Sequence, residues 1–392
     1  MQLGQPTGID PPTDRGRRWA ATMAGHGGGD IRRAHADSTA RTVPGPSGPR
    51  GRQAREEQER ADLAPGATRA EGGGRRVMPE EPDPLRTCFE RDRDRILHSS
   101  AFRRLAGKTQ VFIFPADHQR TRLTHALEVA QVATSIARAA RLNVALTEAI
   151  ALGHDCGHGP GGHASEDALG IFLPDGFDHA VWGADVSLRE LNLCHETLDG
   201  IRNHSWSRPA PSTAEGEVVS WADRIAYVCH DWEDAVSAGI VSADQLPPLV
   251  RARCGTRRSD QLGTFVGAMV DTMARTGVVG MDEETAEALA AFRRCNYELV
   301  YLRPASVAQA VSVVAVLRAL VDHFADHPNR IPDVREAGGI GGGDDAVRAA
   351  VAYVAGMTDR FAMACAVSEL GWDPARLPRG VEEIGLTGRP AP

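Results

Sequence analysis

The stretch LTHALEVAQVATSIARAARL, residues 123–142, carries apolar side chains at three- and four-residue spacing, which predicts an amphipathic helix. The same spacing recurs in residues 85–105, 215–238, 284–303, 304–324 and 344–370. Thr147 is placed to cap a further helix over residues 148–155. Only TQVFIF, residues 109–114, resembles a strand. We therefore expect an all-α helical fold with at most a short β-hairpin.

Residues 1–80 differ in composition from the rest of the chain. They are rich in Gly, Pro and Arg, and Trp19 is their only Phe, Trp or Tyr. Such a segment buries too little apolar surface to offset the entropy lost on ordering, so we expect it to be disordered. The remaining residues, 81–392, then form one helical domain with a C-terminal helical extension from about residue 240.

Composition narrows the class of protein. The net charge of −8 and the pI near 6.0 give no general signature of nucleic-acid binding. The seven cysteines include no CxxC pair, which favours reduced thiols over a disulfide framework or a thiolate zinc site. The sequence shows no membrane-length apolar run and no secretory signal. We expect a cytoplasmic protein without a membrane partner.

The run ALGHDCGHGPGGH, residues 151–163, concentrates histidines in a glycine-rich turn. His154 and Asp155 are neighbours, so both can meet one ion only if its other ligands come from other helices. Two candidates stand on predicted helices, His125 and Asp223. Two imidazoles and two carboxylates suit Mn, Fe, Co, Ni, Zn or Mg and leave coordination positions open for hydrolysis. The residues therefore indicate a divalent metal site.

Several blocks of this chain together resemble one known family, the deoxyguanosine triphosphate triphosphohydrolases of the HD superfamily. The resemblance rests on RDRDRILHSSAFRRLAGKTQVF (91–112), HQRTRLTHALEVAQ (118–131), LTEAIALGHDCGHGPGGHASEDAL (146–169) and SWADRIAYVCHDWEDAVSAG (220–239). It covers roughly residues 86–240, and these motifs occur in the family's order. It implies an HD-domain helical fold.

The resemblance also implies a reaction and a set of residues. The family cleaves a deoxynucleoside triphosphate to the deoxynucleoside and inorganic triphosphate. In this reaction water attacks the α-phosphorus and the 5′-oxygen leaves. It implies a divalent metal held by His125, His154, Asp155 and Asp223. His158 and His163 would then serve the phosphates, and a nearby polyanion would favour their charged forms. Glu166 would orient His163 or help to activate water, so we take His158, His163 and Glu166 as catalytic candidates.

The family's contacts with the nucleotide map onto further positions. The resemblance implies substrate contacts at Gln110, Arg122, Arg224, Tyr227, Asp231, Arg293 and Tyr301. Tyr227 and Asp231 follow Asp223 by four and eight residues, so the three share one helix face. In the family the tyrosine stacks under the deoxyribose, and the aspartate binds the 3′-hydroxyl.

The chain departs from the family pattern at some positions. HGPGGH (158–163) replaces the family's HPPFGH, so Gly161 stands where many members have Phe. FDHAVWGAD (177–185) has Ala180 in place of Asn, although His179 is kept. CHETLDGIRNH (194–204) resembles the family's WETxEGIxxH, with His195 in place of the Trp or its neighbour. These departures bear on base specificity more than on catalysis.

Two other functions fit the same residues. One is a different HD phosphohydrolase, either a deoxynucleotidase or an alarmone hydrolase. The other is a nucleotide sensor that keeps the fold without turnover, although the intact ligand set argues against it. The family resemblance also implies a homo-oligomer, and it leaves open a nucleotide or single-stranded DNA as an effector.

Overall fold

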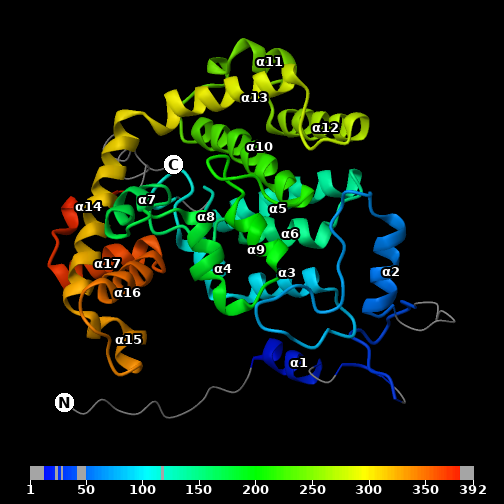
Figure 1. Cartoon of the computed structure of the whole chain (residues 1–392), viewed down its shortest axis with the longest axis horizontal. Helices are drawn as coiled ribbons and strands as arrows, with labels where there is room; N and C mark the ends of the chain where they lie inside the picture. Colours follow the sequence, from blue (N-terminus) through cyan, green and yellow to red (C-terminus); the bar gives the residue numbers. More distant parts are fainter. Residues whose placement is uncertain (1–12, 23–24, 28–29, 42–49, 116–118, 380–392) are drawn as a thin grey trace. The chain divides into compact units, whose positions relative to one another are not determined.

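The structure is a computed structural model that describes residues 13–22, 25–27, 30–41, 50–115 and 119–379. Contacts between residues divide the chain into two units, Met1–Arg50 and Gly51–Pro392. In the first unit, helix α1 spans Asp14–Thr22, and His26 pairs with Arg33 in an isolated bridge. The second unit contains the other described helices and the candidate site (Figure 1).

Helices form the second unit, which confirms the predicted all-α fold. The first group comprises α2 (Arg52–Asp62), α3 (Cys88–His98), α4 (Ser100–Arg104), α5 (Arg122–Ala139), α6 (Val144–Gly153), α7 (Ala164–Leu169), α8 (His179–Trp182), α9 (His195–Arg202) and α10 (Ala214–Ser237). The second comprises α11 (Pro248–Cys254), α12 (Arg258–Thr276), α13 (Glu283–Asn296), α14 (Pro304–Asp326), α15 (Pro332–Glu336), α16 (Asp344–Ala355) and α17 (Asp359–Leu370). Short π-helical turns cover residues 183–187 and 297–301.

The strand-like segment 109–114 is not a strand. Residues 110–114 form bends, and Thr109 pairs with Thr121 in an isolated bridge. Phe112 packs in one hydrophobic core and Ile113 in another. The apolar run therefore reflects a connection between two cores, which sequence periodicity alone does not distinguish from a strand.

Helix α6 occupies the middle of the main core. It packs against α3, α5, α9 and α10, and most of its side chains are buried. Asn143 caps this helix by accepting a hydrogen bond from the Leu146 amide, so the predicted cap at Thr147 is wrong. Thr147 lies inside the helix, where its hydroxyl donates to the Asn143 carbonyl. The helix ends at Gly153, so the histidine-rich turn begins directly after this buried helix.

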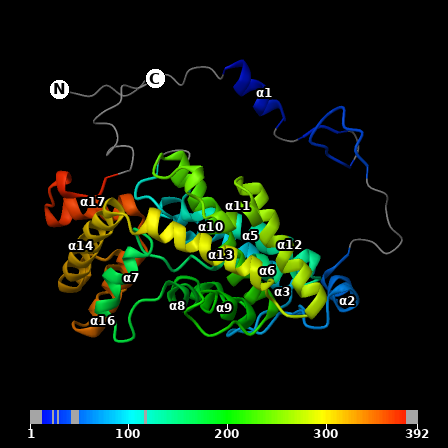
Figure 2. The same ribbon diagram turned by 90° about the horizontal axis from the view of Figure 1, so that it is seen from above.

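The C-terminal helices divide between two places. Helices α11, α12 and α13 pack with one another, and α12 and α13 also contact α10. Helix α14 packs with α7, α16 and α17 around a second hydrophobic core. Figures 1 and 2 both show α7, α14, α16 and α17 gathered at one end of the unit.

Helix α14 is long and apolar enough to cross a membrane by length and composition, a test that core helices also pass. Its buried face, which includes Val313 and Leu317, belongs to the second core.

Residues 50–80 differ from the prediction of disorder. Helix α2 lies in this segment, and Ala67 and Ala70 are buried in the main core. Arg76 forms a buried ion pair with Asp92 of α3 at 2.6 Å. The boundary of the folded unit therefore lies near residue 51 rather than 81. Composition misses this because the segment is held by individual long-range contacts and contributes few large apolar side chains.

Candidate active site

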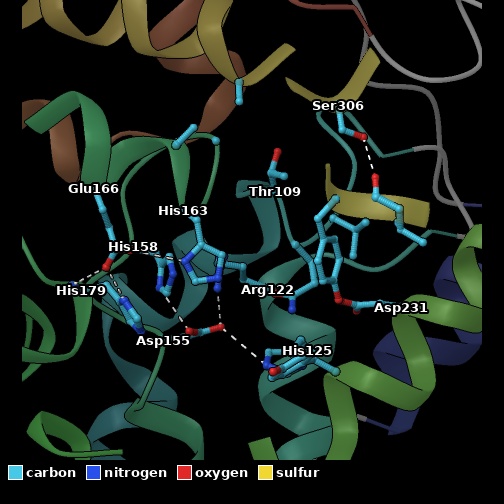
Figure 3. A pocket seen from close by; sticks show the side chains of 18 of the residues that line it. Thr109, Arg122, His125, Asp155, His158, His163, Glu166, His179, Asp231 and Ser306 are labelled. Carbon is cyan, nitrogen blue, oxygen red and sulfur yellow. Dashed lines mark hydrogen bonds and ion pairs between the residues drawn. The ribbon is translucent and has the colours of Figure 1, made fainter. Parts of the chain in front are cut away.

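Three segments bring four predicted metal ligands together. His125 lies on the first turn of α5, His154 and Asp155 follow α6, and Asp223 lies in α10. The Nε2 atom of His125 is 3.0 Å from Oδ1 of Asp223. The Nε2 atom of His154 is 3.5 Å from Oδ1 of Asp155 and 3.7 Å from Oδ1 of Asp223. The structure thus places all four side chains around one point, as Figure 3 shows for His125 and Asp155.

His154 and Asp155 lie directly after α6. The helix ends at Gly153, His154 keeps right-handed helical backbone angles, and Asp155 follows in a turn. The Nδ1 atom of His154 hydrogen-bonds with the Ala151 carbonyl at 2.7 Å, which makes Nδ1 the donor and leaves Nε2 with a lone pair. This Nε2 atom is buried and has no hydrogen-bond partner among the described residues. A buried, oriented and unpaired imidazole nitrogen fits a metal ligand.

The electrostatics favour ionised carboxylates at this point. Burial raises the pKa of Asp155, but Arg122 and the nearby rings of His154 and His158 outweigh burial and lower the pKa well below its ordinary value. Burial likewise raises the pKa of Asp223, whereas the hydrogen bond with His125 lowers it, and the net pKa falls below the usual range. Both groups are therefore carboxylates at neutral pH, the form that binds a metal ion.

The catalytic candidates lie beside this cluster. Nδ1 of His158 is 3.1 Å from Oδ1 of Asp155. Burial and the charge of Arg122 lower the pKa of His158 well below its ordinary value. The ring is therefore neutral before substrate binds, whereas the expectation of a charged form concerns the site with a polyanion bound. The His163 side chain is 75% exposed, and its Nδ1 lies 3.4 Å from Oε2 of Glu166. His163 is thus the candidate that solvent and substrate reach freely.

Glu166 joins His163 to a second histidine. Its Oε1 atom accepts hydrogen bonds from the ring Nδ1 of His179 at 2.7 Å and from the His179 backbone amide at 3.1 Å. Burial raises the pKa of Glu166, but hydrogen bonds with His163 and His179 lower it far more. A carboxylate that accepts from two rings fixes the orientation of both (Figure 3).

His179 and His204 were missing from the predicted site residues. Their Nε2 atoms lie 3.2 Å apart, and the His204 ring meets that of His154 edge-on with centroids 4.9 Å apart. Burial, followed by the neighbouring His154 and His179, lowers the pKa of His204 to about 3. The sequence signal that could have identified them is the histidine of two motifs. His179 is the third residue of FDHAVWGAD, and His204 is the last residue of CHETLDGIRNH. Local spacing does not indicate that these two motifs meet.

A pocket of about 570 Å³ joins the ligand cluster to the predicted nucleotide contacts. This volume lies within the usual range for small-molecule sites. The predicted substrate residues that line it are Gln110, Arg122, Arg224, Tyr227, Asp231, Arg293 and Tyr301. His125, Asp155 and Asp223 line the same pocket, as do His158, His163 and Glu166. The structure therefore brings the predicted metal, catalytic and substrate groups into one cavity.

Contacts within the pocket wall hold the substrate candidates in place. Arg293 donates from Nε to the Tyr227 hydroxyl at 2.7 Å. The Tyr301 hydroxyl donates to Asp231, which also accepts from Arg120. Arg120 is buried and was not predicted, although it lies in the quoted block HQRTRLTH. It is a structural partner that orients Asp231 through their ion pair.

Two arginines that line the pocket have N–H donors available to bind an anion. Arg122 is 2% exposed, and its Nε and Nη2 atoms have no hydrogen-bond partner among the described residues. The guanidinium of Arg224 lies over the ring of Trp206, with its carbon 3.3 Å from the ring centroid. A cation stacked on an indole keeps its N–H donors free at its edges. Both arginines line the pocket and favour a ligand with several negative charges.

The comparisons with known proteins agree with this site. An HD domain model matches residues 122–228, and a phosphohydrolase-associated domain model matches residues 279–367. A deoxyguanosinetriphosphate triphosphohydrolase-like protein from Caldanaerobacter subterraneus subsp. tengcongensis is 42% identical over 321 residues, covering 80% of this chain and 93% of the relative. A protein of the same name from Clostridium perfringens (strain 13) is 40% identical over 301 residues, covering 72% of this chain and 86% of that relative.

A solved structure of a hypothetical protein from Aquifex aeolicus has a TM-score of 0.44 at 20% identity, covering 73% of this chain and 69% of that chain. The matched models, the helical fold and the histidine–aspartate cluster define a phosphohydrolase of the HD class. Within that class, the chain belongs to the deoxyguanosinetriphosphate triphosphohydrolase-like family. The resemblance inferred from the sequence is thereby confirmed.

Proposed function

We propose that this protein hydrolyses deoxynucleoside triphosphates, with dGTP as the family's reference substrate, to the deoxynucleoside and inorganic triphosphate. The observation that carries the proposal is one continuous pocket. A metal-ligand cluster and Arg122 lie beside a wall of Tyr227, Asp231 and Tyr301. The first group suits a phosphate chain, and the second suits a sugar.

His125, His154, Asp155 and Asp223 are the residues that would hold the metal. They fit a divalent ion because the buried Nε2 of His154 has no other partner in the described structure and faces two ionised carboxylates. The mixed nitrogen and oxygen donors suit Mn, Mg, Fe, Co, Ni or Zn. When bound, such an ion polarises a phosphoryl oxygen and lowers the pKa of water.

The chain's own residues perform the remaining tasks. Arg122 and Arg224 bind the phosphates, and Arg224 keeps its orientation because it stacks on Trp206. Water attacks the α-phosphorus and passes a proton to solvent as the new P–O bond forms, and the bond between that phosphorus and the 5′-oxygen breaks. The imidazolium form of His163 donates a proton to the departing 5′-oxygen and becomes neutral imidazole. Glu166 orients His163 through Nδ1, and the neutral His158 has two buried ring nitrogens without a hydrogen-bond partner in the described residues, which are available to the phosphates.

The sugar wall supports selection of a deoxyribose. Tyr227 is fixed by its hydrogen bond from Arg293, and Asp231 by those from Tyr301 and Arg120. A ring fixed under C2′ leaves no room for a 2′-hydroxyl, and an oriented carboxylate accepts from the 3′-hydroxyl. Gln110 presents a buried side-chain oxygen without a partner in the described residues, a group available to the nucleoside.

Product analysis tests the proposal. The purified protein is incubated in Mn²⁺ with each of the four dNTPs, with GTP and with dGMP. We expect deoxynucleoside and intact triphosphate from at least one dNTP and far slower turnover of GTP. Phosphate released only from dGMP would instead indicate a deoxynucleotidase, and bound metal without turnover of any nucleotide would indicate a sensor. An alarmone is added to the panel to test the remaining HD phosphohydrolase alternative.

Self-association, effector binding and cytoplasmic location remain predictions. The exposed apolar side chains Leu302, Val307 and Val311 beside and on α14 support a homo-oligomer. Light scattering measures the mass of the particle, and a monomer would contradict this prediction. Adding dNTPs or single-stranded DNA to the assay tests for an effector.

A further inference from the structure

Two buried ionisable side chains, Lys108 and Asp359, contact the histidine turn and have no part in the chemistry proposed above. Both are 3% exposed. Lys108 is the only lysine in the chain, and Asp359 begins α17 in the C-terminal helices. Burying a charge is costly unless it is hydrogen-bonded, so the partners of these two groups indicate what they hold.

Asp359 binds two segments of the pocket wall. Its Oδ2 atom accepts from the Thr109 hydroxyl at 2.6 Å. Its Oδ1 atom accepts from the Gly161 backbone amide at 2.8 Å. Thr109 precedes Gln110, and Gly161 lies between His158 and His163. One carboxylate therefore fixes the nucleoside-facing segment against the turn that carries two catalytic candidates.

Lys108 makes a second connection of the same kind. Its Nζ donates to the His158 carbonyl and, at 3.0 Å, to the Ala355 carbonyl at the end of α16. The Lys108 carbonyl in turn accepts from the backbone amide of Arg122 at 3.2 Å. The backbone of the histidine turn, the start of α5 and the C-terminal helices thus converge on a dipeptide, Lys108–Thr109.

The turn is also pressed directly against α14. Gly161 has φ +73°, and a Cβ added there would come within 2.5 Å of Val313 in that helix. Gly162 has φ +64°, and its added Cβ would lie 2.8 Å from Nη2 of Arg122. Gly161, which stands where the family's HPPFGH has Phe, therefore lets the turn lie directly against α14.

We propose that Asp359 and Lys108 are positioning residues through which the C-terminal helices hold His158 and His163 in catalytic geometry. This inference rests on the proposed function for its catalytic consequence. The hydrogen bond between Thr109 and Asp359 involves none of the four metal ligands, and Asp223 lies in α10. Loosening the turn should therefore slow chemistry while leaving the metal cluster assembled.

Thr109→Val tests this proposal, with Thr109→Ser as its matched control. Valine has nearly the same shape but lacks the hydroxyl that Asp359 holds, whereas serine keeps it. We expect kcat for the best dNTP to fall about 10- to 100-fold in the valine variant, with a smaller change in KM, because misplaced catalytic groups cost rate. Metal content and the unfolding midpoint should stay near wild type, and the serine variant should recover most of kcat.

Hydrogen exchange of a peptide covering residues 157–163 provides a readout independent of activity. We expect faster exchange in Thr109→Val than in Thr109→Ser, and wild-type exchange in peptides from α10. Unchanged kcat together with unchanged exchange would overturn the proposal. If the wild-type protein hydrolyses no nucleotide, the proposed function fails, and the exchange comparison alone decides whether the contact positions the turn. Asp359→Asn is the second variant if valine lowers the unfolding midpoint, because the amide cannot accept at both positions.

Discussion

Arg122 donates from Nη1 to Oδ2 of Asp155 across 2.8 Å, and both side chains are almost completely buried. Arg122, which we propose binds phosphate, and Asp155, which we propose binds the metal, therefore form an ion pair with each other. The pairing keeps Asp155 ionised and leaves the other N–H groups of Arg122 without partners in the described residues. The end of the pocket proposed to bind phosphate is therefore built around this ion pair.

Arg122→Gln should weaken nucleotide binding about 10- to 100-fold, because a hydrogen bond to a charged group contributes about 1.5–3 kcal/mol. Calorimetry with a non-hydrolysable dNTP analogue measures the effect. Arg251→Gln, at an exposed position on α11, is the control and should bind as wild type. Equal affinity of both variants would remove Arg122 from the phosphate site.

Asp155→Asn should lose metal and hydrolysis together. The substitution keeps the shape of the side chain but removes the charge that the ligand cluster requires. Elemental analysis after desalting measures the metal, and Asp167→Asn, at an exposed position on α7, serves as the control. An active, fully metal-loaded Asp155→Asn protein would contradict the ligand assignment.

His163→Ala should keep its metal and lose about 10²- to 10⁴-fold in kcat, as expected when a general acid is removed. His195→Ala is the matched control, because His195 is exposed and does not line the pocket. Steady-state kinetics at saturating nucleotide distinguish the two variants. Wild-type turnover by His163→Ala would assign the proton transfer to another group.

Tyr227→Ala should reduce discrimination against ribonucleotides, because the ring that excludes a 2′-hydroxyl is gone. The ratio of kcat/KM for dGTP to that for GTP measures this directly. Arg293 donates to the Tyr227 hydroxyl, so Tyr227→Phe separates loss of that hydrogen bond from loss of the ring. We expect the phenylalanine variant to keep most of the discrimination; a ratio that is the same in all three proteins would exclude the stacking role.

The pH dependence of stability should include a contribution from His230 of α10. Burial first, and then Arg120, lowers the pKa of His230 from 6.5 to about 3. The unfolded state therefore takes up a proton as the pH falls below 6.5, whereas the folded state does not until about pH 3. The contribution of neutral His230 to the free energy of unfolding is therefore fully present above pH 6.5 and is lost as the pH falls toward 3. At pH 5 the loss is about 2 kcal/mol.

Urea unfolding at pH 7.5 and pH 5 measures this change. His230→Gln should lose about 2 kcal/mol less than wild type between these values, because glutamine does not titrate. His195→Gln, at an exposed position, should match the wild-type slope. Identical slopes in wild type and His230→Gln would show that this ring titrates normally in the folded protein.

Much of the site was predictable because its residues come from local motifs. His154 and Asp155 are adjacent in the sequence, and Tyr227 and Asp231 follow from helical spacing after Asp223. The residues in each of these relationships lie within a few positions of one another in the sequence, so local geometry is enough to relate them. The structure places all of them in or beside one pocket.

The remaining features depend on contacts between distant segments. His179 and His204 meet across 25 residues, and Asp359 reaches Gly161 across 198. No periodic pattern encodes such pairs. The packing of residues 50–80 was missed for the same reason, since it depends on contacts such as Arg76 with Asp92. The segment 109–114 misled because burial in two cores produces the same apolar run as a strand.

The central claim is that water attacks the α-phosphorus of a dNTP in this pocket. Turnover in ¹⁸O-labelled water, followed by mass spectrometry of both products, tests it most directly. Our account predicts intact triphosphate that carries one labelled oxygen, together with unlabelled deoxynucleoside. Label in the deoxynucleoside, or release of orthophosphate or diphosphate in place of triphosphate, would contradict it.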